Sequence, residues 1–230
     1  MMRKKFLFGL LCLLVCLICM HGCRACFFKD VETQGLVYTL INNGTEYEVS
    51  GEKSTTPNIV IPKTYKGIPV TTIAEDAFCF NKNIVSVQLP ESIITIKDFA
   101  FNFTKLKTIT VPKSVKTIGS NAFSQSTFET IIFEEGSSLI SLGSSAFRFC
   151  DNLEEITLPN GVIKIESDLF QHCENLKKVY FSSNVTYIGS HAFDDCKSLK
   201  EMILPSKITY IGEFAFSKCM ALKTITIPSS

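Results

Sequence analysis

The sequence predicts a β-rich solenoid: a right-handed coil in which each repeat supplies one main parallel strand, a short second strand and a 3₁₀ or helical turn. Three observations support this fold class: a phenylalanine that recurs every 22 to 24 residues, aliphatic residues in fixed register with it, and a strand-like alternation after it. The recurring residues are Phe78, Phe101, Phe123, Phe147, Phe170, Phe193 and Phe216. Each unit is too small to bury its own apolar face, so successive coils must stack.

Residues 1–22 are predicted to be a secretory signal peptide. Three basic residues near the start precede an apolar run of 15 residues, Phe6 to Met20, which is short for a membrane-spanning helix. Gly22 and Cys23 resemble the end of a bacterial lipobox, so Cys23 is a candidate for lipidation. Ordinary cleavage nearby and an uncleaved signal anchor are the alternatives.

Charge gives no indication of a nucleic-acid partner. The chain has 23 basic and 22 acidic residues, and loss of residues 1–22 would leave 20 and 22, a net charge of −2. A balance this close to neutral implies no general attraction to nucleic acid.

After a linker at residues 23–35, residues 36–57 are predicted to form a capping β-hairpin. Alternating segments flank Asn43-Gly44, a dipeptide that favours a tight hairpin turn. Such a hairpin would cover the open edge of the first coil.

Residues 58–230 are predicted to form the solenoid, with about seven repeats of 23 residues. Five positions before each phenylalanine comes an aliphatic residue of the second strand, such as Ile96 or Ile188. Alternation with β-branched residues after the phenylalanine predicts the main strand, which proline closes in five copies. Its predicted inward pairs are Val87/Leu89, Ile109/Val111, Ile131/Phe133, Ile156/Leu158, Val179/Phe181, Met202/Leu204 and Ile225/Ile227.

One repeat breaks the register. It lacks a residue after Phe123, gains two after Phe133, and has the loop Glu134 to Ser138 in place of the proline turn. Loops of a solenoid absorb length changes without disturbing the stack. We favour neutral drift over a contribution to a binding surface.

Four cysteines recur every 23 residues, three positions after the repeat phenylalanine: Cys150, Cys173, Cys196 and Cys219. A straight column does not offer the converging ligands that a metal needs. Distance alone does not exclude disulfides between neighbours, but earlier repeats place Asn81, Thr104 and Ser126 in this slot. Small groups packed in a tight turn fit all seven repeats, so packing is the favoured interpretation.

The repeat resembles the coil of the BspA-type leucine-rich repeat proteins. The segment from Val185 to Pro205 carries nearly the whole pattern, V-x-x-I-G-x-x-A-F-x-x-C-x-x-L-x-x-I-x-L-P, and the resemblance covers about residues 36 to 230. It implies a leucine-rich repeat solenoid and adhesion to host or neighbouring-cell proteins.

The outward residues of the main strands are the candidate ligand-binding face. Tyr180 and two isoleucines are apolar where a solvated strand needs no such residue, although cross-strand pairs of this kind also stabilise any sheet. We expect seven stacked strands, about 4.8 Å apart, to form one exposed sheet roughly 30 Å long. The candidate residues are Thr130, Ile132, Glu155, Thr157, Lys178, Tyr180, Glu201 and Ile203.

The sequence does not favour catalysis. Beyond the leader only His172 and His191 remain, in different repeat slots, and no nucleophile, acid and orienting group share a convergent spacing. We therefore expect no catalytic residues, no metal and no cofactor.

The predicted function is a secreted or cell-surface protein, possibly lipid-anchored, that binds a protein or glycan on another surface. Membrane contact is expected only through the leader or a lipid. The alternative is a structural module of the cell envelope that self-associates through an uncapped last coil and has no external ligand.

Overall fold

The computed structural model describes residues 33–52 and 54–227. The predicted signal peptide at 1–22, the lipidation at Cys23 and nearly all of the linker lie outside the described residues. The described residues contain no helix that is both long and apolar enough to span a bilayer.

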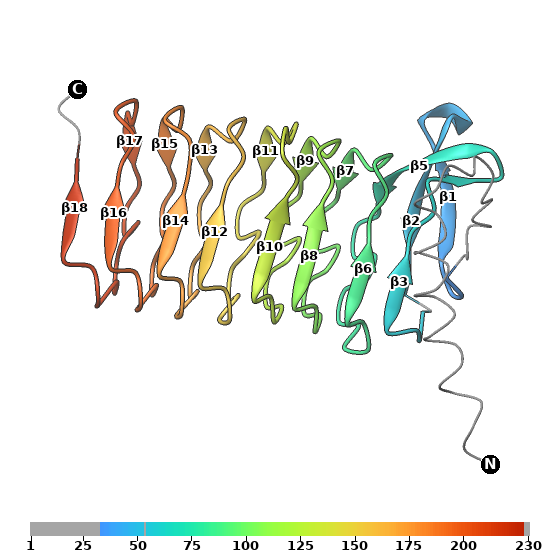
Figure 1. The fold of residues 1–230 in the computed structure, drawn as a ribbon, viewed down its shortest axis with the longest axis horizontal. Coiled ribbons are helices and arrows are strands. Elements are labelled where there is room, and N and C mark those ends of the chain that lie inside the picture. The colour runs from blue at the N-terminus through green and yellow to red at the C-terminus, as the bar shows by residue number, and fades with distance from the viewer. Residues whose placement is uncertain (1–32, 53, 228–230) are drawn as a thin grey trace, which may run out of the picture. The chain divides into compact units, whose positions relative to one another are not determined.

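The described chain winds into a solenoid of stacked coils (Figure 1). Its main strands follow one another along one side and lie parallel wherever they pair. They are β3 (Asn58–Val60), β6 (Ser86–Gln88), β8 (Thr108–Val111), β10 (Thr130–Phe133), β12 (Glu155–Thr157), β14 (Lys178–Tyr180), β16 (Glu201–Ile203) and β18 (Thr224–Thr226). This is one strand more than the seven expected, because β3 precedes the first repeat phenylalanine and pairs with β6.

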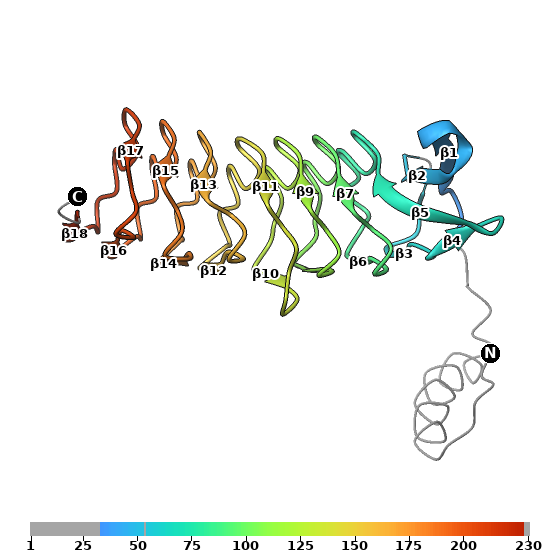
Figure 2. The same ribbon diagram turned by 90° about the horizontal axis from the view of Figure 1, so that it is seen from above.

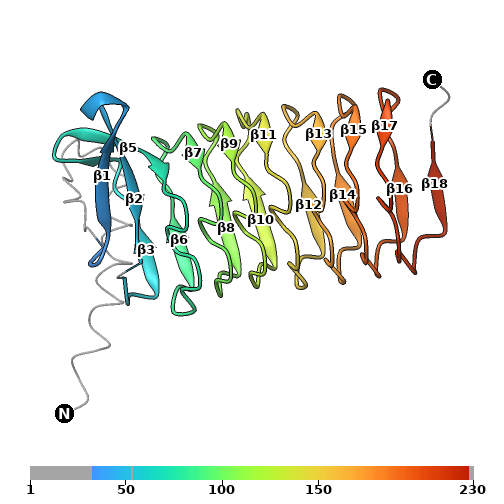
Figure 3. The same ribbon diagram turned by 180° about the vertical axis from the view of Figure 1, so that it is seen from behind.

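The predicted short second strands form a separate ladder, seen from behind in Figure 3. They are β5 (Ile68–Ile73), β7 (Thr95–Ile96), β9 (Thr117–Ile118), β11 (Ser141–Leu142), β13 (Lys164–Ile165), β15 (Tyr187–Ile188) and β17 (Tyr210–Ile211). The ladder runs from β5 to β11, breaks, and resumes from β13 to β17.

At the N-terminal side, β1 (Val37–Ile41) and β2 (Glu46–Ser50) form an antiparallel hairpin. The connection is η1 (Asn42–Gly44), where Asn43 and Gly44 have φ of 56° and 83°. β2 pairs in parallel with β5, and the short strand β4 (Thr64–Tyr65) pairs with β5 in the antiparallel sense. The hairpin therefore extends the ladder of second strands.

The repeat phenylalanines form the centre of the core. Six of the seven are fully buried, and Phe216 is half-buried. Their rings stack from coil to coil, with centroids 5.2 to 5.7 Å apart. The column predicted from the sequence is thus a continuous stack of aromatic rings.

The segments around these phenylalanines, which we call the turn face, differ from the expected helical or 3₁₀ turn. Bonds of the 3₁₀ type do form, for example from the Asn81 N–H to the Phe78 oxygen at 3.1 Å. Residues two positions before and after each phenylalanine, however, have positive φ, as at Ser145 and Phe149. This left-handed backbone interrupts any helix and produces consecutive tight turns.

Because the turn-face backbone zigzags, it forms its own ladder between coils. At each of the six boundaries, the phenylalanine and the residues two before and two after it donate N–H bonds to the next coil. At the boundary between Phe123 and Phe147, the N–H groups of Asn121, Phe123 and Gln125 do so at 2.8 to 3.0 Å. The turn face is therefore hydrogen-bonded without a break.

The cysteine column completes the turn face. The thiols of Cys150, Cys173, Cys196 and Cys219 each donate to the repeat-phenylalanine oxygen of the preceding coil, at 3.0 to 3.2 Å. Ser126 does the same at 2.7 Å. The cysteines in the described residues are free, and three of this column are fully buried. The packing interpretation of the column is confirmed.

The last coil departs from the predicted core. Ile225 occupies the predicted inward slot, in register with the buried Met202, but Ile225 and Ile227 are 36% and 64% exposed. A coil has two faces to bury, and among the described residues only one side of this coil has a neighbour.

Candidate ligand-binding face

The outward residues of the main strands lie where the alternation predicts. Two columns, one on each side of the inward residue, run along the face, and all eight candidate residues are exposed except Lys178, which is half-buried. We call this surface the strand face.

The strand face is not the continuous sheet expected from the sequence. The main strands pair only in twos: β3 with β6, β8 with β10, β12 with β14, and β16 with β18. The prediction of seven strands in one ladder is therefore wrong. The pairing strands are three or four residues long, and a proline without an N–H ends most of them.

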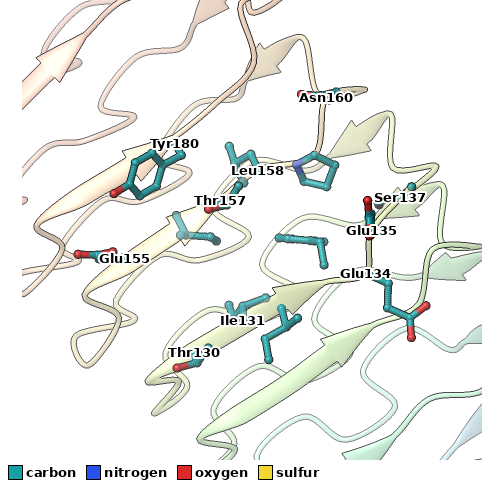
Figure 4. Close-up of a pocket in the computed structure, with 15 residues that line it drawn as sticks. Thr130, Ile131, Glu134, Glu135, Ser137, Glu155, Thr157, Leu158, Asn160 and Tyr180 are labelled. Atoms are coloured by element: carbon teal, nitrogen blue, oxygen red, sulfur yellow. The ribbon is translucent and has the colours of Figure 1, made fainter.

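The unpaired neighbours leave two grooves. A first groove of about 490 Å³ lies between β10 and β12 (Figure 4). A second, of about 320 Å³, lies between β14 and β16. The first is lined by Thr130, Ile132, Glu155 and Thr157, the second by Lys178, Glu201 and Ile203, and Tyr180 lines both. The structure thus brings all eight candidate residues into two adjoining grooves.

The first groove lies on a seam where both strand ladders break. β10 does not pair with β12, and β11 does not pair with β13 in the described chain. The loop Glu134 to Ser138 is bonded to the preceding coil, since the Glu134 and Ser138 N–H groups donate to the Val111 and Lys113 oxygens. On the other side, β12 bonds toward β14, where the Leu158 N–H donates to the Tyr180 oxygen at 2.8 Å.

The seam is nevertheless held together beyond the strands. The turn-face ladder crosses it, and the rings of Phe123 and Phe147 stack at 5.7 Å. At the end of the loop, a Cβ added to Gly161 would lie 2.3 Å from the Leu139 oxygen, so the two backbones are in close contact there. The seam therefore lacks strand pairing in both ladders, and the turn face bonds across it.

The residues at the loop end of this groove were not among the candidates that the sequence predicts. Glu134, Glu135 and Ser137 line it from the irregular loop, and Asn160 lines it from the turn after β12. A loop beside β10 extends beyond the turns of the neighbouring coils (Figure 2). The two-residue insertion after Phe133 is the sequence feature that could have indicated these residues, since the loop that it forms lines the first groove.

The two grooves differ in charge. Three carboxylates line the first groove, from Glu134, Glu135 and Glu155, and no lysine or arginine lines it. In the second, the Lys178 Nζ lies 3.9 Å from a Glu201 oxygen and 4.8 Å from the centre of the Tyr180 ring. A hydrogen bond to Tyr180 raises the pKa of Lys178, so this side chain is cationic at neutral pH.

The groups that could support chemistry are dispersed or unreactive. Burial raises the pKa of Cys150 to about 12, and that of Cys173 well above its usual value, so neither thiol is nucleophilic at neutral pH. His172 and His191 lie on the turn face, each beside an aspartate, Asp195 and Asp194. The described residues contain no group of three or more His, Cys, Asp or Glu placed to hold a metal.

Known proteins resemble this chain in sequence pattern and in structure. Residues 52–141 and 127–230 match the family described as the BspA type Leucine rich repeat region, in six copies. A leucine rich cell surface protein from Faecalibacterium prausnitzii is 30% identical with a TM-score of 0.71, over 84% of this chain and 53% of that one. A search of the curated proteins finds no match.

Two further solved structures share the fold. A leucine-rich repeat protein from Eubacterium ventriosum is 25% identical with a TM-score of 0.67, over 84% of this chain and 51% of that one. A T. pallidum leucine rich repeat protein is 23% identical with a TM-score of 0.58, over 81% of this chain and 99% of that one. The chain spans about half of the Faecalibacterium and Eubacterium proteins. The family match covers most of the repeat region, and the chain belongs to the BspA-type leucine-rich repeat family.

Proposed function

We propose that this chain is a secreted or cell-surface protein that binds another macromolecule through its strand face, in adhesion to a protein of a host or neighbouring cell. The observation that carries the proposal is the pair of grooves in the strand face, lined by all eight residues that the sequence singled out. Grooves of a few hundred Å³ with apolar and polar lining are typical binding sites. Membership of the family and the name of the Faecalibacterium protein support a surface location.

Tyr180 is the centre of the proposed site. Its ring lies between the two grooves and is 43% exposed, and Ile203 beside it is 75% exposed. Tyrosine is one of the residue types that are enriched among binding hot spots. Replacement of Tyr180 and Ile203 should remove binding energy without disturbing the core.

The experiment coats fluorescent beads with the full chain and counts the beads retained on epithelial cells and on neighbouring bacterial cells. We expect the double variant Tyr180→Ser and Ile203→Ser to lose most of the retention seen with the unaltered chain, with an unchanged melting temperature. The matched control is Tyr210→Ser and Ile140→Ser, because these residues are 47% and 65% exposed on the side of the second strands. No retention of the unaltered chain, or equal retention by both variants, would exclude the strand face as an adhesive surface.

A second candidate function is self-association without an external ligand. The observation that favours it is the exposed apolar surface of the last coil, which includes Met220 and Ile227. Light scattering of the full chain over a range of concentrations tests it. A mass that rises with concentration, and stays at the monomer value after Met220→Ser and Ile227→Ser, supports this function; a constant monomer mass rejects it.

A further inference from the structure

The first groove has an unbalanced charge. Three carboxylates line it, and its lining contains no basic side chain. Lys178, the register partner of Glu155, belongs to the second groove, where its Nζ lies 3.9 Å from a Glu201 oxygen. Glu134 accepts a hydrogen bond from the Lys113 backbone N–H at 3.0 Å, but that donor brings no full positive charge. A cationic partner would complement this groove and would not be required by the second one.

The carboxylates lie at the two ends of the groove. Figure 4 shows Glu155 at one end, near the Tyr180 ring, and Glu134 and Glu135 at the other. The described residues offer no cluster of three acidic side chains that could share one metal ion. The arrangement therefore fits two separate positive charges better than a single cation.

The middle of the groove is apolar. Ile131, Ile156 and Leu158 form its floor as part of the core, and Ile132 is exposed beside them. An apolar side chain between the two charges would be removed from water against this floor, which favours binding.

The spacing of the charges matches an extended chain. Glu155 and Thr130 are the first residues of the neighbouring strands β12 and β10, and Glu134 comes four positions after Thr130. At about 3.3 Å per residue this corresponds to roughly 13 Å. In an extended segment, residues i, i+2 and i+4 point to the same side, so charges at i and i+4 would frame an apolar residue at i+2.

We propose that the first groove binds an extended polypeptide segment that carries lysine or arginine at i and i+4 and an apolar residue at i+2. This inference rests on the proposed function and names the chemistry of its partner. The basic side chains pair with Glu155 at one end and with Glu134 or Glu135 at the other, and the apolar side chain lies over the Ile131 and Ile156 floor. Because the carboxylates are at the rim, binding weakens as salt is added.

The probe is a fluorescein-labelled peptide with the core Lys-Thr-Leu-Thr-Lys, measured by fluorescence anisotropy with the full chain. Two comparison peptides have Glu-Thr-Leu-Thr-Glu and a core with the lysines at i and i+3. We expect the first peptide to bind at least about three times more tightly than either comparison peptide, since a rim ion pair contributes up to about 1 kcal/mol.

The matched protein variants separate groove charge from net charge. Glu135→Gln with Glu155→Gln should raise the dissociation constant of the first peptide about three- to tenfold. The control pair, Glu91→Gln with Glu213→Gln, removes two exposed carboxylates outside the groove lining and should leave it unchanged. Equal effects of the two pairs, equal binding of the i and i+3 peptide, or no binding at all would overturn the inference.

This test can fail while the proposed function stands. If the Tyr180 and Ile203 variant loses cell retention but the basic peptide does not bind, the strand face is adhesive and its partner has another chemistry. If the peptide binds as expected but cell retention does not depend on Tyr180, the first groove prefers basic peptides and the proposed adhesion through the strand face is wrong.

Discussion

The turn face and the strand face are built from the same repeat but connect neighbouring coils differently. The turn face has backbone bonds across every coil boundary, a continuous phenylalanine stack and thiols that donate from one coil to the preceding one. The strand face pairs its strands only in twos and leaves grooves at two of the boundaries between pairs. In this solenoid, continuous bonding and open grooves therefore lie on different faces.

The comparison also explains how the protein accommodates an insertion. The loop at Glu134 to Ser138 coincides with a break in both strand ladders, yet the turn face crosses that boundary unchanged. A stack that is held on one side can open on the other without losing its core.

The largest effect is expected from the ring stack. Phe147→Ala removes a fully buried ring between two stacked neighbours and should lower the free energy of unfolding by about 3 to 5 kcal/mol. Tyr180→Ala, on the strand face, should change it by less than about 0.5 kcal/mol. Urea denaturation of both variants makes the comparison, and similar losses would mean that the two faces are not distinct.

A smaller loss in the free energy of unfolding is expected from substitutions at glycines where the backbones of neighbouring coils are in close contact. A Cβ on Gly189 would lie 2.5 Å from the Ser167 backbone nitrogen, so Gly189→Ala should cost about 1 to 3 kcal/mol through overpacking. Gly136, in the loop beside the first groove, has open space around it but a φ of 75°, so Gly136→Asn, which tolerates that backbone, should cost little. Thermal unfolding followed by circular dichroism measures both changes, and a neutral Gly189→Ala would contradict the close packing.

The thiol column predicts a loss of stability at alkaline pH. Burial raises the pKa of Cys150 to about 12, so its contribution is complete below the unfolded value of about 9 and is lost as the pH rises from 9 to 12. At pH 10 the loss from this residue should be about 1.4 kcal/mol.

The Cys150→Ser variant isolates the pH-dependent contribution of the thiol. Serine fits this slot, because Ser126 occupies it in an earlier repeat and donates to the Phe101 oxygen. The free energy of unfolding of the variant should fall less than that of the unaltered chain between pH 8 and pH 10 in urea titrations. Parallel pH curves for the two proteins would show that the thiol does not titrate on unfolding.

The sequence predicted the features that depend on repetition. The phenylalanine column, the alternation in the main strands and the cysteine slot each recur at a fixed spacing, so each could be assigned to an inward or outward position without a structure. The eight candidate residues followed from the same alternation, and the structure brings them to two grooves.

What the sequence could not provide is whether neighbouring strands actually pair. Pairing depends on backbone positions in two coils, and β10 and β12 have the same alternating pattern as the paired strands β8 and β10. The left-handed residues of the turn face were also hidden, since non-glycine residues such as Phe149 and His172 occupy them. The position of the acidic loop beside a groove was hidden for the same reason, because it depends on which neighbouring strands pair.

The most direct test is amide hydrogen exchange at matched positions on the two strands β12 and β14. The backbone amide of Thr157, on β12, is directed toward β10, with which β12 does not pair. The amide of its register partner Tyr180, on β14, is directed toward β12, with which β14 does pair. We expect the Thr157 amide to exchange at least about ten times faster than the Tyr180 amide, while the Phe123 and Phe147 amides of the turn face stay protected on both sides of the seam. Equal protection of Thr157 and Tyr180, or fast exchange at Phe123, would contradict the separation of the two faces.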